Sequence, residues 1–234
     1  GNNGHWTRNL IVSPDGAKLY VSVGSVSNVA DEGMDVEEGR AAIWEFNPDG
    51  SSARIYASGL RNPVGMAWAP DESALWVAVN ERDMLGDNLV PDYMTSVRDG
   101  GFYGWPYSYW GQTIDERVEP QRPDLVATAL TPDYALGAHT ASLGLMFYNY
   151  DGFPERYWNG AFVGQHGSWN RSERVGYKVI FVPFTGARPN GPPEDFLTGF
   201  LNARGEAQGR PVGPLPCLGG VTGNSDEVFR QILR

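Results

Sequence analysis

The sequence predicts an all-β fold, a β-propeller of the six-bladed type that is incomplete here, with about four blades present. Three observations support this prediction. The 234 residues include 30 Gly and 17 Pro, spread along the chain, and such residues punctuate short strands and break helices. A strand–turn–strand unit recurs. No segment has the periodicity of a long amphipathic helix.

The recurring unit places a Pro-Asp turn between short apolar strands. Proline presets the φ angle of a turn, and the Asp side chain caps it. Strands are expected at residues 10–12 and 18–24 around the first turn, at 43–46 before the second, and at 65–68 and 75–79 around the third. A repeat of roughly 40–60 residues built from short strands is typical of propeller blades. The three turns are Pro14-Asp15, Pro48-Asp49 and Pro70-Asp71.

The rest of the chain fits one partial propeller domain, residues 1–234. Two further strands are expected at 161–163 and 177–184, whereas residues 86–97 and 111–135 are expected to form long loops. Leu197 to Leu201 is expected to make one helical turn. Residues 214–234 form an atypical closing segment, because Pro214 and Pro216 remove donors that a central strand needs.

Composition excludes several classes of protein. With 41% hydrophobic and 20% charged residues, the chain can bury a core. A net charge of −10 argues against nucleic acid, whose binding depends on Lys and Arg. No apolar run is long enough for a membrane span, and the one cysteine, Cys217, permits no internal disulfide. The motifs of serine hydrolases, phosphate-binding loops and nicotinamide-binding folds are missing from the sequence.

Three segments could carry chemistry. The histidines His5, His139 and His166 each lie beside Gly or small polar residues, where an imidazole can transfer protons; a structural role is the alternative for each. Arg61-Asn62, held between Gly and Pro, offers a fork of donors to an anionic ligand or bridges two loops of the scaffold. The oxygen-rich residues 80–88 suit calcium or form a solvated acidic loop.

Taken together, these segments resemble the glucose/sorbosone dehydrogenase family, in its sorbosone dehydrogenase-like branch. The resemblance runs from His5 to about Gly213, with one or two blades expected to be missing before His5, so that the chain is interpreted as N-terminally truncated. The matching segments are Gly4-His5, residues 10–16, Ser58-Gly59-Leu60-Arg61-Asn62-Pro63, residues 100–106, Gly164-Gln165-His166-Gly167-Ser168-Trp169-Asn170-Arg171 and residues 209–213.

The resemblance implies a six-bladed propeller that binds pyrroloquinoline quinone and Ca²⁺ at one end of its channel. It implies that His5 is the catalytic base and that Arg61 assists catalysis by stabilising the charge that hydride delivery creates. Arg61 and Asn62 would contact the quinone, and backbone carbonyls at Glu81 and Arg82 would hold the metal. Further cofactor contacts are implied for His166, Trp169, Arg171 and Arg210.

The function implied is the oxidation of an aldose or sugar aldehyde by hydride transfer to the quinone, in a periplasmic or secreted protein with a small-molecule sugar substrate. One alternative is a non-catalytic carbohydrate-binding or scaffold propeller fragment. Another is a calcium-dependent lactonase. In the first alternative the loop aromatics would stack on sugars; they are Trp105, Tyr107, Tyr109 and Trp110.

Overall fold

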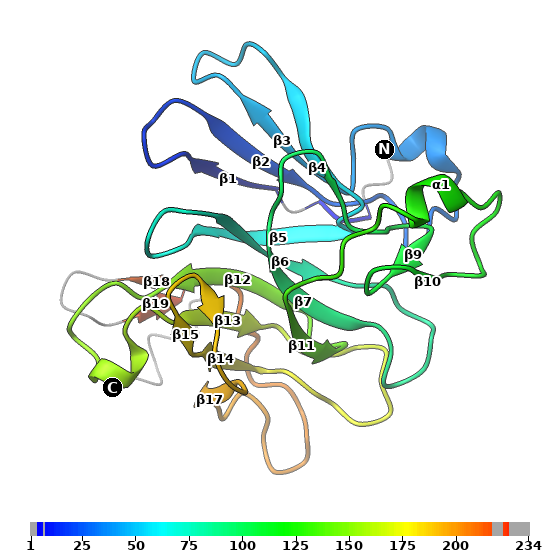
Figure 1. The fold of residues 1–234 in the computed structure, drawn as a ribbon. Helices are drawn as coiled ribbons and strands as arrows, with labels where there is room; N and C mark the ends of the chain where they lie inside the picture. Colours follow the sequence, from blue (N-terminus) through cyan, green and yellow to red (C-terminus); the bar gives the residue numbers. More distant parts are fainter. Residues whose placement is uncertain (1–3, 7, 217–221, 225–234) are drawn as a thin grey trace.

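The computed structural model describes residues 4–6, 8–216 and 222–224, and they form consecutive antiparallel sheets (Figure 1). The first sheet contains β1 (Arg8–Val12), β2 (Leu19–Val23), β3 (Ala42–Phe46) and β4 (Arg54–Ser58), with the short β8 (Gly101–Phe102) added in parallel to β4. The second sheet has the order β11-β7-β6-β5 and the third β12-β13-β14-β17. Each of these sheets is a propeller blade, because its first strand lies nearest the axis and the later strands follow outward in chain order.

The strands of the second blade are β5 (Asn62–Trp68), β6 (Leu75–Asn80), β7 (Pro91–Ser96) and β11 (Tyr134–Ala138). Those of the third blade are β12 (Ser142–Phe147), β13 (Ala161–Gln165), β14 (Lys178–Val182) and β17 (Glu194–Leu197). Three two-stranded sheets accompany the blades: β9 (Ser108–Tyr109) with β10 (Thr113–Ile114), β15 (Phe184–Thr185) with β16 (Arg188–Pro189), and β18 (Pro214–Pro216) with β19 (Thr222–Asn224). The helical pieces are single turns: η1 (Met34–Glu37), α1 (Pro123–Val126) and η2 (Glu155–Tyr157).

The first strands of successive blades, β1, β5 and β12, lie next to one another around the axis, and β18 lies beside β12. Glycines permit this close approach. A Cβ on Gly65 of β5 would lie 2.5 Å from the carbonyl oxygen of Leu143 in β12, and a Cβ on Gly144 of β12 would lie 2.5 Å from that of Val212. No side chain fits where two backbones come so close.

The core fills the spaces between blades. One apolar cluster joins the first and second blades and includes Tyr20, Ile43, Leu60 and Val77. A second joins the second and third blades through residues such as Trp76 and Met94. Buried on both sides, β6 reads as a continuous apolar run, Leu75 to Val79.

The predicted β-propeller is confirmed, and the strands expected at 10–12, 18–24, 43–46, 65–68, 75–79 and 161–163 are present. Residues 177–184 contain β14 and the start of β15. Within the described ranges, three sheets have four or more strands, and the pair β18 and β19 begins after Arg210. Cys217 and most of the predicted closing segment lie outside the described residues.

The loop prediction for residues 86–97 and 111–135 is wrong in part. Residues 91–96 form the central strand β7, while the second range contains β10, α1 and the first residues of β11. The polar residues of β7 obscure its strand pattern in the sequence. Thr95 can be buried because its hydroxyl donates to Asp133 at 2.9 Å, and Asp92 can be buried because hydrogen-bond donors surround its carboxylate. The expected turn of helix at Leu197 is also wrong, since Leu197 ends strand β17.

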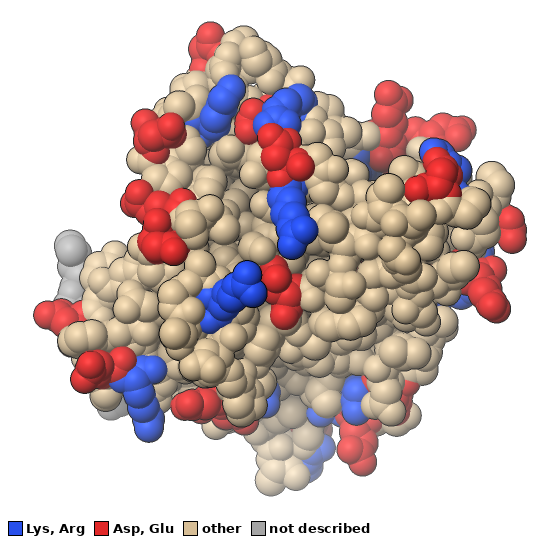
Figure 2. Space-filling model, in the orientation of Figure 1, with Lys and Arg blue, Asp and Glu red and all other residues tan. Residues whose placement is uncertain are grey.

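Figure 2 shows one face of the molecule, on which acidic and basic side chains lie close to one another and wide areas carry neither. No broad group of Lys and Arg gathers on this face. Among the described helices, none is long and apolar enough to cross a membrane.

Candidate functional site

A cavity of about 200 Å³ lies where the axial strands begin. It is formed by the segment before β1, the start of β5, the end of its partner β6 with the turn that follows, the start of β7, the turn between β11 and β12, and the loop after β13. Because β5 and β6 are antiparallel, Asn62 and Asn80 face each other at this end of the blade. The cavity is lined by His5, Arg61, Asn62, Asn80, Glu81, Asp83, Asp92, His139, Ala141 and Trp169.

His5 is held by the end of the first blade. Its Nδ1 lies 3.0 Å from the carbonyl oxygen of Ser25 and 2.9 Å from the Ser25 hydroxyl, and its backbone N–H donates to the same carbonyl. A carbonyl only accepts, so Nδ1 carries the proton and Nε2 keeps its lone pair. Burial, followed by the charge of Arg61, lowers the His5 pKa from 6.5 to about 3. His5 is therefore a neutral proton acceptor at physiological pH.

Gly24 allows His5 and Asn62 to lie close together. A side chain at this position would collide with the amide oxygen of Asn62 and with the Cβ of His5. The buried Asn62 Oδ1 has no hydrogen-bond partner among the described residues, and no hydrogen bond of its Nδ2 is formed with them either. The amide is thus held by packing and keeps its hydrogen-bonding capacity for a ligand.

Arg61 is buried, and its guanidinium joins three chain segments. It donates to the carbonyl of Asn28 at 3.0 Å and to the carbonyl of Glu81 at 2.7 Å. The carboxylate of Asp83 lies 3.6 Å away. Desolvation lowers the pKa of Arg61, and Asp83 and Glu81 oppose that shift. The structure therefore shows the loop-bridging role of Arg61, and it also places this residue in the lining of the cavity.

Acidic groups face Arg61 across the cavity. The buried Glu81 carboxylate accepts from Arg82 through Oε2, whereas its Oε1 has no partner among the described residues. Asp92 accepts from the backbone N–H groups of Glu81 and Ser142 and from Thr140. Even with these donors, burial raises the pKa of Asp92 to about 6. The interpretation of residues 80–88 as a solvated acidic loop is wrong for Glu81 and Arg82, which are both buried.

Arg82 does not line the cavity. Its guanidinium is fully buried on the other side of the turn and bonds to Glu81, Asp115 and the carbonyls of Pro106 and Ser108. Within the described ranges, no three His, Cys, Asp or Glu side chains converge to hold a metal ion. A cation at Glu81 would therefore need backbone, amide or ligand oxygens as well.

The other predicted cofactor residues divide into two groups. Trp169 lines the cavity and is 69% exposed, whereas Arg171 lines an adjoining hollow and donates to the carbonyl of Asp87. His166 and Arg210 lie together at the end of β13, where Arg210 donates to Tyr177 at 3.1 Å and His166 contacts the carbonyl of Pro211. The structure brings together in one cavity the predicted residues His5, Arg61, Asn62, Glu81 and Trp169. The other predicted site residues lie outside this cavity: Arg82, His166, Arg171 and Arg210.

Two cavity residues were not singled out for this site from the sequence. Asp92 was assigned to a loop. His139 lies in a left-handed turn with φ 61°, and its ring nitrogens contact Asp83 at 3.2 Å and the carbonyl of Gly86 at 2.9 Å. The available signal was its position between small residues just before a strand, which His5 shares. Among the loop aromatics, Trp105 and Tyr107 are buried, so they cannot stack on sugars.

The fold and the cavity together define a β-propeller protein with a polar ligand site at one end of its axis. The chain belongs to the glucose/sorbosone dehydrogenase family, whose model matches residues 1–166. The predicted family is thereby confirmed.

Three relatives illustrate the similarity. An uncharacterized protein of Borreliella burgdorferi is 32% identical over 98% of this chain and 60% of its own length. The aldose sugar dehydrogenase YliI of Escherichia coli is 34% identical over 45% of this chain and 27% of its own length. The holo pyranose dehydrogenase PQQ domain from Coprinopsis cinerea superposes with a TM-score of 0.75 at 24% identity, over 96% of this chain and 68% of that one. The chain thus spans 60% or less of these two curated relatives.

Proposed function

We propose that this chain carries the reaction site of a sugar dehydrogenase that uses pyrroloquinoline quinone together with Ca²⁺. The observation that carries the proposal is His5: its Nδ1–H is committed to Ser25, so a neutral Nε2 remains in a cavity that also holds Arg61 and Asn62. The family and the pyranose dehydrogenase PQQ domain support the same class of chemistry. By the same resemblance we expect a periplasmic or secreted protein.

The residues present fit the cofactor only together with a cation. A quinone bearing carboxylates would be repelled by Glu81, Asp83 and Asp92, which outnumber Arg61, the one arginine among the described residues of the lining. A divalent cation reverses that balance, and the unpaired Oε1 of Glu81 is a hard oxygen ligand of the kind Ca²⁺ prefers. Trp169, exposed at the edge of the cavity, offers an aromatic face to a flat ring system.

When bound, the quinone would supply a two-electron acceptor for the hydride that leaves C1 of the sugar, and loss of the C1 hydroxyl proton would complete the oxidation to a lactone. In this chain His5 Nε2 takes that proton. Ser25 keeps the imidazole in the required tautomer and orientation. Arg61 would provide positive charge where negative charge develops, and the Asn62 amide would donate a hydrogen bond to an oxygen of the bound group.

The proposal is tested by titrating the 234-residue chain with pyrroloquinoline quinone, with and without Ca²⁺, and by following dye reduction with a panel of aldoses. We expect quinone binding that depends on Ca²⁺ and sugar-dependent dye reduction. His5→Gln should lower kcat by about 10²–10⁴-fold, the range of general-base catalysis, and leave quinone affinity within twofold to threefold. Absence of quinone binding in the presence of Ca²⁺ would refute the proposal, and so would full activity of His5→Gln.

A further inference from the structure

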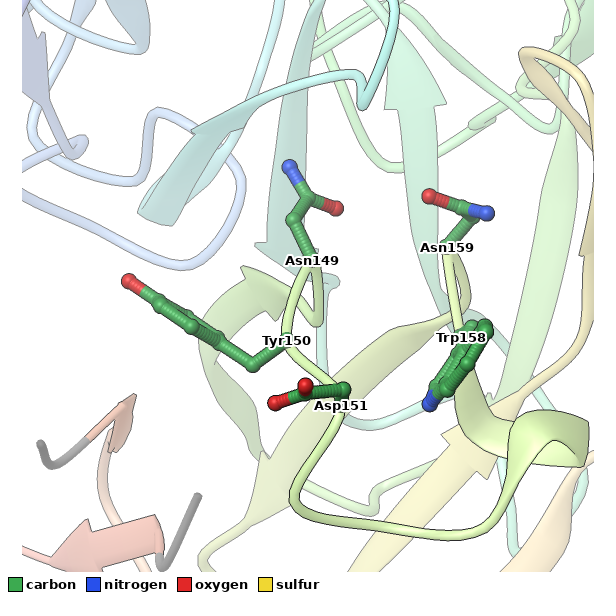
Figure 3. Close-up of a pocket in the computed structure, with 5 residues that line it drawn as sticks. All are labelled: Asn149, Tyr150, Asp151, Trp158 and Asn159. Carbon is green, nitrogen blue, oxygen red and sulfur yellow. The ribbon is translucent and has the colours of Figure 1, made fainter. Parts of the chain in front are cut away.

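A second cavity, of about 390 Å³, lies beyond the opposite end of β12. The first cavity reaches Ala141, just before β12, whereas the second begins at Asn149, two residues after it. At about 3.3 Å per strand residue, the six residues of β12 alone put roughly 20 Å between them. Asn149 also lines a third pocket, which runs beside the axial strands β1, β5 and β12. The cavity is formed by Asn149, Tyr150, Asp151, Trp158 and Asn159 (Figure 3).

The cavity presents two aromatic side chains to solvent. Trp158 is 41% exposed, yet its indole N–H is fixed by a 2.9 Å hydrogen bond to the carbonyl of Phe153. Tyr150 is 49% exposed, and its ring centroid lies 5.6 Å from that of the buried Tyr148. Exposed rings cost free energy in water, and a ring held in one orientation is a ready stacking surface.

Three polar side chains of the same cavity have unused hydrogen-bonding capacity. The side chains of Asn149, Asp151 and Asn159 form no hydrogen bond within the described part of the chain. Figure 3 shows the amides of Asn149 and Asn159 pointing the same way from two neighbouring segments, with Asp151 and Trp158 beneath them. Asn159 has φ 58°, a left-handed conformation that Asn tolerates better than most residues.

This combination defines the ligand chemistry. An anion is disfavoured because, among the described residues, Asp151 is the only charged one in the lining. A purely apolar ligand would desolvate three polar groups without pairing them. A sugar satisfies both conditions: its C–H face stacks on an indole, and its hydroxyls bond to amide and carboxylate groups. The volume lies within the range of small-molecule sites, about 300–1,000 Å³.

We propose that this cavity is a second saccharide-binding site, distinct from the cavity of His5, which takes a neutral sugar either free or at the end of a glycan chain. Trp158 is the stacking platform, and Asn149, Asn159 and Asp151 are the hydroxyl partners. The site has no redox role and does not depend on the quinone. Its failure and the failure of the proposed dehydrogenase function are therefore separable.

The test is calorimetric titration of the cofactor-free chain with glucose, cellobiose and maltoheptaose. We expect saturable binding of at least one sugar, weakened by about tenfold in Trp158→Ala, the loss expected when a stacking contact is removed. Asn159→Gly, which retains the left-handed backbone, should weaken binding severalfold. Trp169→Ala is the matched control, an exposed tryptophan at the other cavity, and should leave this binding unchanged. Comparable affinity for glucose and maltoheptaose would indicate free sugar, and binding of maltoheptaose alone a glycan chain.

The proposal is overturned if none of the three sugars binds the wild-type chain, or if Trp158→Ala binds as tightly as wild type. Should Trp158→Ala fail to fold by circular dichroism, Asn149→Ala and Asp151→Asn decide, since they keep the indole in place. Unchanged affinity in both of these variants would also overturn it. Retained dehydrogenase activity in Trp158→Ala is expected, because the reaction site lies at the other end of β12.

Discussion

The protonation of His5 depends on its surroundings rather than on the imidazole itself. Burial is the largest influence, and the positive charges of Arg61, Arg40 and Arg8 act in the same direction, against one opposing hydrogen bond from Ser25. These arginines come from three different segments of the chain. Because its pKa is lowered to about 3, His5 stays neutral at neutral and mildly acidic pH, and this suits a proton acceptor.

The lowered pKa of His5 predicts how stability depends on pH. Between about pH 3 and 6.5, the unfolded state binds a proton at His5 that the folded state does not, so this residue makes stability rise with pH and lose that contribution as pH falls. Asp92 acts oppositely: its pKa is raised from 3.8 to about 6, so the folded state binds the extra proton and stability falls as pH rises through that window.

The measurement is urea unfolding of wild type and His5→Gln across this pH range. The two effects largely cancel in wild type between about pH 4 and 6, whereas the variant should lose stability as pH rises. The difference in unfolding free energy, wild type minus variant, should increase up to about pH 6.5, with a limiting slope near 1.4 kcal/mol per pH unit. A pH-independent difference would contradict the lowered pKa.

Arg61 should be essential for folding as well as for ligand binding. Arg61→Met leaves the carbonyl of Glu81 without its donor, removes one of the two donors to the carbonyl of Asn28, and takes the guanidinium away from Asp83, so we expect a loss of about 3–5 kcal/mol in unfolding free energy. Arg54→Ala is the control: Arg54 also pairs with two carboxylates, but it is exposed, and its loss should cost at most about 1 kcal/mol. Equal losses in urea unfolding would show that burial is not decisive here.

At the scale of single residues, the sequence predicts part of the lining of the cavity. His5, Arg61 and Glu81 stand beside Gly, Pro or a strand end, so their positions carry a signal. Asp92 carries none, because a buried carboxylate in a strand reads as a loop residue until its three donors are known. Trp158 and Asn159 lie in a turn whose partner segment, Asn149 to Asp151, is identified only by the fold.

Among the elements, the axial strands are those most constrained by backbone contact. β5 and β12 approach through Gly65, and β12 meets the segment before β18 through Gly144. The sequence pattern Pro-Val-Gly occurs at residues 63–65 and again at 211–213, and the structure places both at axial positions. The glycine is therefore part of the repeat, although the Pro-Asp turns give the clearer sequence signal.

Substitution of these glycines should separate contact from conformation. Gly65→Ala and Gly144→Ala force two backbones apart without requiring an unusual φ, so each should lower the unfolding free energy by about 1–3 kcal/mol. Gly213→Ala is the matched control, since a Cβ there meets no described atom within 4 Å; its effect should stay within about 0.5 kcal/mol. Urea midpoints measure all three, and an equal effect at Gly213 would exclude close approach as the cause.

Element prediction succeeds where strands are apolar and fails where they are not. β6 is a run of buried Leu, Trp, Val and Ala, and this apolar run is recognised as a strand from the sequence alone. β7 contains Asp92 and Thr95, whose polar groups are satisfied within the core. β12 was missed because Gly144 interrupts its apolar pattern, for the reason of axial packing given above.

In the molecule as a whole, the first blade exposes an apolar face within the part of the chain that the structure describes. Cross-strand pairing places Leu10, Val21, Trp44 and Ile55 in one row, and Val12, Leu19 and Phe46 in the next. Leu10, Val12 and Ile55 are exposed, and Trp44 stacks on Phe46 with centroids 6.1 Å apart. In a propeller such a face packs against the neighbouring blade. Contiguous exposed apolar surface of this kind mediates association.

We therefore expect the 234-residue chain to self-associate through the face defined by Leu10, Val12 and Ile55. The net charge of −10 opposes association at low ionic strength, so salt should strengthen it by screening the repulsion. Sedimentation velocity over a concentration series should show a shift toward larger species that increases with salt. Ile55→Glu adds a charge in the middle of the apolar row and should abolish the shift.

Exposed Ile114, on β10 and away from the first sheet, provides the control Ile114→Glu, which should associate as wild type does. A chain that stays monomeric at every concentration and salt level, or an Ile55→Glu variant that associates unchanged, would show that this face is not an interaction surface.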